Sequence, residues 1–206
     1  MYRLGFCALA AFLAVSPAAA QGLQFGGKAG PSFTTIVLDE DEGPPFERRI
    51  AAAGGGFVVL PIAARLSLQV EALTTPRGTR LEPEESDGIV QTLMVRYLEF
   101  PVLLRVNGPR RGGGWYFFGG GYTALRLSAK EQLSSFTGFT NAGTREDVGD
   151  AIELVENGLI GGAGLELGKY LLVEGRYARG LTNINKVDGA PPFTSRALTF
   201  MLGVRF

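Results

Sequence analysis

The side chains of this chain that could do chemistry are acids, bases and one glycine-rich run, without the groups that usually activate them. None of the 206 residues is a histidine, so the usual general base, the usual zinc ligand and every Ser-His-Asp arrangement are missing. The single cysteine, Cys7, lies in an apolar N-terminal leader. We therefore predict no catalytic residue, no cofactor and no metal site.

Two local motifs resemble ligand sites but occur in the wrong context. Residues 119–124 fit the pattern G-x-G-x-x-A of a dinucleotide site, yet that pattern must lie between a strand and a helix, and here it lies within a strand-like segment. Residues 39–42 are acidic, but Gly43 and Pro44 follow them, whereas an EF-hand loop needs an oxygen ligand at its fifth position. We expect a strand for the first motif, and for the second a solvated loop, with a loose divalent-cation site as the alternative.

Eight charged residues share a more informative position, because each falls on the polar side of a segment in which apolar residues alternate. They are Lys28, Glu71, Glu99, Arg105, Arg126, Glu166, Glu174 and Arg176. The positive and negative members balance, and buried charges are costly unless they are paired. If this side faces the interior of a fold, we expect an ion-pair network that fills it. A narrow polar path or a small-ligand site is the alternative.

The segments that carry these charges alternate with the period of two that is typical of β-strands. In the last segment, Leu198, Phe200 and Leu202 share one face, whereas Thr199 and Gly203 share the other. Seven earlier segments behave similarly: 21–37, 49–60 (weaker, being rich in Ala and Gly), 63–75, 89–106, 114–130, 152–168 and 169–184. Eight is an even number of strands, as a closed antiparallel barrel requires.

The links between these segments alternate in length. Long links fall near 38–48, 76–88, 131–151 and 185–194, and short ones near 60–64, 107–113 and 168–169. Large outer loops that alternate with tight periplasmic turns are typical of outer-membrane barrels. For residues 21–206 we predict an all-β fold, an eight-stranded antiparallel up-and-down transmembrane β-barrel with long outer loops and short periplasmic turns.

The N-terminal 20 residues have the features of a secretory signal peptide. Arg3 gives a positive start, residues 4–15 an apolar core, and residues 18–20 a run of alanine for cleavage. We therefore predict export and an outer-membrane location. Basic and acidic residues number 20 each, which argues against a nucleic-acid partner because binding phosphates requires a basic excess.

The apolar face of such a barrel contacts outer-membrane lipid, and aromatic residues gather where lipid meets water. We expect an interface girdle beside the predicted short turns, formed by Trp115, Tyr116, Tyr170 and Phe206. Phe136 and Phe139 lie in the longest predicted link, where exposed aromatics can contact a partner or pack onto the barrel rim.

Four stretches resemble a known family: residues 25–33, 97–105, 161–166 and 174–184. They are similar to the PorT-like outer-membrane β-barrel domain, and the resemblance covers nearly all of residues 21–206. It implies a barrel without catalytic residues, and the terminal Phe206 resembles the aromatic residue that the barrel-assembly machinery reads in such proteins. The segment 49–60 departs from the family by its many Ala and Gly residues.

These observations predict a small outer-membrane barrel with a structural or surface-interaction role through its long outer loops, and an envelope or surface protein as its partner. A narrow channel or small-solute transporter is one alternative, motivated by the interior charges. A soluble, lipocalin-like binding barrel is another, because alternation alone does not say which face lies inside. An outer-membrane enzyme is disfavoured, since such enzymes generally rely on histidine.

Overall fold

The fold of the protein is given by a computed structural model. The structure describes residues 22–38, 47–81, 89–108, 113–135, 143–147, 152–184 and 193–206. The predicted signal peptide, the acidic run 39–42 and both loop aromatics, Phe136 and Phe139, lie outside these ranges. None of the described residues forms a helix long and apolar enough to cross a membrane.

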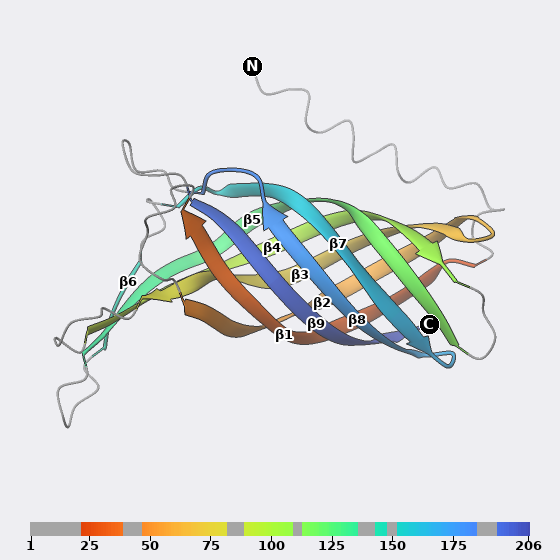
Figure 1. Cartoon of the computed structure of the whole chain (residues 1–206), viewed down its shortest axis with the longest axis horizontal. Coiled ribbons are helices and arrows are strands. Elements are labelled where there is room, and N and C mark those ends of the chain that lie inside the picture. The colour runs from red at the N-terminus through yellow and green to blue at the C-terminus, as the bar shows by residue number, and fades with distance from the viewer. Residues whose placement is uncertain are drawn as a thin grey trace, which may run out of the picture.

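The described residues form antiparallel strands, most of which are long and tilted (Figure 1). The strands are β1 (Gln24–Leu38), β2 (Glu47–Ala63), β3 (Leu66–Leu81), β4 (Ile89–Asn107), β5 (Gly113–Ser135), β6 (Gly143–Asp147), β7 (Val155–Leu167), β8 (Leu171–Gly180) and β9 (Phe193–Arg205). The motif 119–124 lies within β5, as expected for a run of glycine that belongs to a strand.

Eight of these strands close into a barrel. Their order is β4-β3-β2-β1-β9-β8-β7-β5, and a β4–β5 pairing completes the ring. The first and last strands pair along most of their length, from Gly26 opposite Arg205 to Leu38 opposite Phe193. Closure leaves no sheet edge within the ring, which is the condition for a β-sheet to cross lipid. The predicted eight-stranded antiparallel barrel is confirmed.

One described strand, β6, is not part of the ring and lies in a region that we expected to be a loop. β6 falls within the predicted link 131–151 and pairs with residues 130–134 of β5, while β3 continues to Leu81 within the predicted link 76–88. The cause is the length of β4, whose residues 89–96 pair with β5 on one side and, from residue 91, with β3 on the other. Figure 1 shows this sheet of β3, β4, β5 and β6 reaching beyond the barrel at the end opposite the C-terminus.

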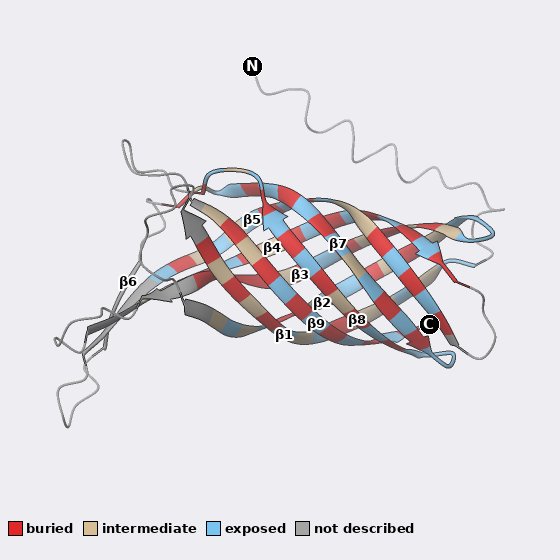
Figure 2. Cartoon of the chain, in the orientation of Figure 1, coloured by how far each residue is buried: buried red, intermediate tan, exposed pale blue. Residues whose placement is uncertain are grey.

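Exposed and buried residues alternate along the barrel strands (Figure 2). In β7, Leu159, Leu165 and Leu167 are exposed, whereas Ile160 and Glu166 are buried. Large apolar side chains therefore cover the outside, and charged side chains lie inside. A soluble lipocalin-like barrel needs the opposite arrangement, so that alternative is wrong. The outward apolar face is the one that suits a lipid environment.

The interior of β5 packs against a glycine stripe on β7. Tyr116, Phe118 and Tyr122 lie opposite Gly164, Gly162 and Gly158, in that order. A Cβ atom on any of these glycines would overlap the ring it faces. The aromatic rings thus fill the space that the missing side chains leave, which is how small barrels pair large with small residues.

Candidate functional site

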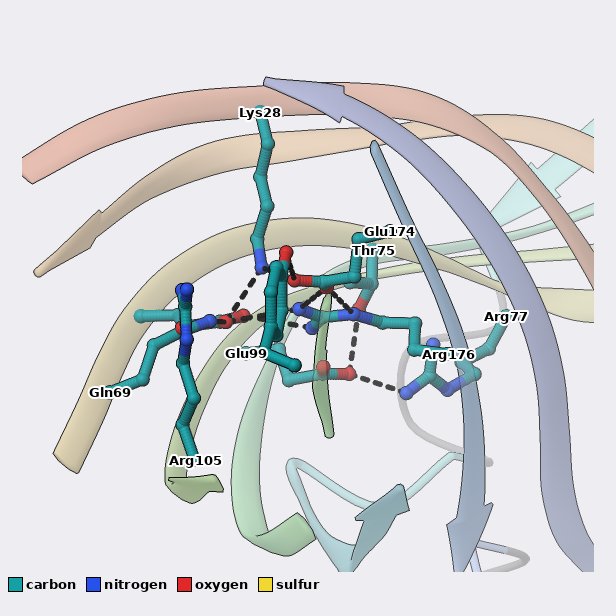
Figure 3. Close-up of polar contacts among 10 residues, drawn as sticks. Lys28, Gln69, Thr75, Arg77, Glu99, Arg105, Glu174 and Arg176 are labelled. Carbon is teal, nitrogen blue, oxygen red and sulfur yellow. Dashed lines mark hydrogen bonds and ion pairs between the residues drawn. The ribbon is translucent and has the colours of Figure 1, made fainter. Parts of the chain in front are cut away.

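The barrel centre holds four charged side chains from three strands. Lys28 of β1 places Nζ 2.7 Å from Glu71 of β3 and 2.9 Å from Glu174 of β8. Arg176 of β8 places Nη1 2.8 Å from the second oxygen of Glu71, and its guanidinium also contacts Glu174. Two bases therefore meet two acids, and the charges of this central cluster cancel (Figure 3).

Neutral groups hold the central carboxylates in place. Gln69 donates a hydrogen bond of 2.5 Å to Glu71, and the hydroxyl of Tyr116 donates one of 3.1 Å to Glu174. The ammonium of Lys28 also lies 5.4 Å from the ring centre of Phe57. Buried charges are tolerated when their remaining hydrogen-bonding positions are filled in this way.

An outer cluster lies between the centre and the projecting sheet. Arg77 of β3 contacts Glu99 of β4 at 2.5 Å and Glu156 of β7 at 3.6 Å. Glu156 also accepts hydrogen bonds from Tyr122 at 2.5 Å and from Ser195 at 2.6 Å. With one base and two acids, this cluster has a formal charge of about −1.

An inner cluster lies beside the short turns. Glu166 of β7 accepts from both Arg105 of β4 and Arg205 of β9. Arg105 also donates to Asn107 at 2.7 Å and lies 3.6 Å from the ring centre of Tyr116. Among the described residues this cluster has two bases and one acid, a formal charge of about +1, so the formal charge of the described clusters falls from the inner end of the barrel to the outer end.

The three clusters lie along the barrel interior, beside buried apolar side chains such as Leu73, Leu103 and Leu172. Their charged side chains come from β1, β3, β4, β7, β8 and β9, and each is at most 10% exposed. The paired groups are thus shielded from bulk solvent, and every acid has a base within reach. These ion pairs can stabilise the contacts between strands, and the ionisable groups in them are bound to one another.

Seven of the eight charges that the sequence singled out lie in these three clusters. Arg126 differs, because it is half-buried on β5 and donates to the carbonyl oxygen of Ile152. Sequence reasoning missed Arg77, Glu156 and Arg205. Arg77 lies two residues beyond the predicted strand 63–75, whereas Glu156 lies within the predicted strand 152–168, and both keep the parity of the inward-facing residues.

The expected interface girdle lies partly outside and partly inside the barrel. Trp115, Tyr170 and Phe206 are exposed beside the short turns, and the rings of Tyr170 and Phe206 are 6.3 Å apart. Phe25, which we did not single out, is exposed 6.1 Å from Phe206. Tyr116 is a correction: it is 1% exposed and binds Glu174, because its position in the alternation of β5 faces inward.

Comparison with known proteins agrees with this architecture. A model of the outer membrane protein beta-barrel domain family matches residues 18–186. No curated protein sequence matches the chain. The chain resembles the crystal structure of Ail, the attachment invasion locus protein of Yersinia pestis, with 14% identity and a TM-score of 0.42 over 89% of this chain and 98% of Ail.

Two further solved barrels are similar. Neisserial surface protein A has 10% identity and a TM-score of 0.43, over 88% of this chain and 97% of that protein. OprG from Pseudomonas aeruginosa has 12% identity and a TM-score of 0.44, over 89% of this chain and 95% of OprG. At these identities the likeness concerns the fold.

Proposed function

Because this chain belongs to the outer membrane protein beta-barrel domain family, we propose that it is a closed membrane anchor that presents the projecting sheet of β3 to β6 to a protein partner at the cell surface. The observation that supports the proposal most is the pairing of β5. Its neighbour changes from β7, which it leaves at Leu125, to β6, which it joins at Lys130. The sheet therefore continues where the barrel ring has ended.

The barrel interior suits an anchor better than a transport path. The central and inner clusters place buried ion pairs across the lumen, between strands β1, β3 and β8 and between β4, β7 and β9. An eight-stranded barrel has room for little more than its own side chains. An ion that crossed would have to separate these pairs in a medium where an unpaired charge is costly.

The projecting sheet offers a backbone edge for recognition. Within the described part of the chain, β6 pairs with β5 alone. An open edge presents unpaired N–H and C=O groups, which bind an extended segment of another protein by adding a strand. The connection 136–142 carries Phe136 and Phe139 to this sheet, and both remain candidate contacts for the same partner.

Photo-crosslinking in whole cells tests the surface role. A photoreactive amino acid at Thr144 of β6 is expected to give a discrete adduct with another protein, whereas the same group at the lipid-facing Leu159 is expected to give none. Adducts from Leu159 alone, or from neither position, would contradict the proposal. Deletion of residues 136–142 is expected to weaken the Thr144 adduct.

Conductance measurements separate the anchor from the channel alternative. The folded protein in planar bilayers is expected to show no single-channel steps. The double variant R105A/R205A removes two large side chains from the inner cluster and serves as the positive control once its gel shift shows that it folds. Steps from the wild-type protein would instead favour a narrow channel or small-solute transporter.

Two finer assignments belong to the same proposal. The likeness of residues 25–33 and 174–184 to PorT-like barrels supports a place among that group. The exposed ring of Phe206 lies beside Tyr170 at the short-turn end, which supports a role as an aromatic residue that the barrel-assembly machinery reads. Replacing Phe206 with Ser is expected to slow insertion into the outer membrane, which pulse-labelling and the gel shift of the folded form would measure.

A further inference from the structure

Five basic side chains lie in one belt around the outer end of the barrel wall. They are Arg49, Arg96, Lys130, Arg179 and Arg196. The strand registers place them at similar heights, because Arg49 lies opposite Thr34 and Arg196 opposite the adjacent Thr35, and Lys130 lies opposite Met94 on β4, two residues before Arg96.

Three of the five line one pocket. It has a volume of about 230 Å³ and spans four adjacent strands, with Arg49 from β2, Pro76 from β3, Arg96 from β4, and Ser128 and Lys130 from β5. The pairing of β2 with β3 is interrupted here, between Arg48 and Gly54. The pocket thus combines three cations and a hydroxyl group in a space large enough for a phosphate group.

Arg96, Ser128 and Lys130 place the pocket on the lipid-facing side of β4 and β5, and the buried Val95 also lines it. Arg49 is half-buried at its edge, opposite the buried Thr34 of β1. Arg96 lies between Val95 and Tyr97, which are both buried in the interior, and is itself exposed. Lys130 likewise follows the buried Ala129 and is exposed. Leu127 of β5 is among the exposed apolar residues of this surface. A cationic pocket that borders an apolar membrane surface lies where lipid headgroups meet their chains.

A like-charge pair marks the opposite side of the belt. Arg179 of β8 lies directly opposite Arg196 of β9, and like charges at facing positions of a sheet are destabilising. The Nε atom of Arg196 is buried, and no described residue accepts a hydrogen bond from it. No ion pair joins Arg49 or Arg96 to a carboxylate among the residues whose side chains the structure describes. Lys130 differs from these two cations, because it lies opposite Asp147 of β6.

We infer that this belt binds the phosphate groups of lipids in the outer leaflet, with the pocket of Arg49, Arg96 and Lys130 as its main site. A phosphate placed between guanidinium groups relieves their repulsion and accepts two hydrogen bonds from each planar fork. The lipid chains would then lie on the apolar wall beneath it. Arg96 and Lys130 lie where the projecting sheet leaves the ring, but lipid binding at this pocket does not depend on the protein partner proposed for that sheet.

Lipid retention in nanodiscs tests the inference. The mature protein is placed in phosphatidylcholine nanodiscs with a small fraction of bisphosphorylated lipid A, and native mass spectrometry measures bound lipid A. The variant R49Q/R96Q is expected to bind lipid A about tenfold more weakly, which corresponds to about 1.4 kcal/mol. The matched control R65Q/K169Q removes the same charge from exposed positions beside the short turns, and it is expected to bind as the wild type does.

Chemical controls identify the bound group. Dephosphorylated lipid A is expected to lose binding to the wild-type protein, and inorganic phosphate alone is expected not to bind. Equal retention of the dephosphorylated lipid would overturn the inference, as would binding of inorganic phosphate in the absence of lipid A, because the site would then serve a free anion. An equal loss in R65Q/K169Q would also overturn it, since the effect would follow from net charge alone.

Stability without lipid A separates a lipid site from an ion pair within the chain. The melting temperature of R49Q/R96Q in micelles of the phosphate-free detergent dodecyl maltoside is expected to equal or exceed that of the wild type, because two like charges have been removed. A lower melting temperature would show that acidic residues of the chain already occupy these cations, and the inference would fail.

Discussion

The central cluster predicts a strong dependence of stability on the balance of its four charges. Glu71 accepts hydrogen bonds from Lys28 at 2.7 Å, from Gln69 at 2.5 Å and from Arg176 at 2.8 and 3.0 Å. Changing Glu71 to Gln keeps the shape of the side chain but leaves two buried bases facing one acid. We expect this single substitution to destabilise the barrel strongly.

The size of the effect follows from the contacts. The amide group of Gln presents a donor where Arg176 needs an acceptor, and it removes the charge that both bases share. Two charge-assisted hydrogen bonds at about 1.5–3 kcal/mol each agree with the cost of about 3–5 kcal/mol for removing one partner of a buried pair. That loss is a large fraction of the stability of a typical domain, about 5–15 kcal/mol.

A second substitution separates charge imbalance from lost packing. Changing Lys28 to Met alone leaves two acids facing Arg176, and we expect a similar loss. The double variant K28M/E71Q restores a balanced pair of Arg176 and Glu174, and the Met side chain can pack against Phe57, which now contacts the lysine. We expect the double variant to be more stable than either single variant, because a neutral replacement of a buried ion pair costs little.

Urea unfolding in lipid vesicles measures these free energies, with Trp115 fluorescence and the gel shift of the folded form as two independent signals. The exposed variant K169Q is the control and should stay within about 0.5 kcal/mol of the wild type. If the losses of K28M and E71Q simply add in the double variant, the two residues are not coupled and the reasoning fails. A negligible effect of E71Q would show that water reaches the cluster.

Three further predictions test the packing and the orientation of the barrel. Gly162→Ala should cost about 1–3 kcal/mol in the same unfolding assay, because the new methyl group overlaps both the Phe118 ring and the carbonyl oxygen of Gly175. Gly161→Ala should be neutral or stabilising, since the nearest neighbour atom to its new methyl group lies 4.0 Å away. Equal effects of the two substitutions would contradict the close packing at the glycine stripe. Tyr116→Phe should cost about 1.5–3 kcal/mol through the lost hydrogen bond to a charged group, and no loss would place the hydroxyl outside the cluster. Bromines near the headgroup should quench Trp115, the only tryptophan, more than bromines at the lipid chain ends, and the reverse order would place it away from the interface.

Much of the barrel could be predicted from the sequence because its physics is local. A strand that separates lipid from a polar interior must alternate at every residue, so Leu198, Phe200 and Leu202 identify their strand without knowledge of its neighbours. The projecting sheet is different. β6 exists because β5 extends past the ring and offers a partner, and such pairing depends on distant residues that alternation within 143–147 does not reveal.

The alternation of the strands also predicted most of the interior charges, but it did not predict which of them pair. A charge at an inward position must find a counter-charge, so parity alone selected Lys28 and Glu174. Parity also placed Tyr116 inside, and its closeness to a short turn misled the girdle assignment. The sequence did not predict which bases pair with which acids. Lys28 and Glu174 lie 146 residues apart, and the shear of the closed ring decides whether they meet.

The interior clusters also bear on how the ring closes. β1 and β8 do not pair with each other, yet Lys28 joins Glu174 across the lumen, and Glu166 joins strands β4 and β9, which lie on opposite sides of β7 in the chain. A partly assembled sheet would expose these charges without their partners, and an unpaired charge in lipid costs several kcal/mol. The clusters therefore disfavour open intermediates within the membrane, so we expect strand insertion and barrel closure to be one cooperative step that the charge balance of Lys28, Glu71, Glu174 and Arg176 controls.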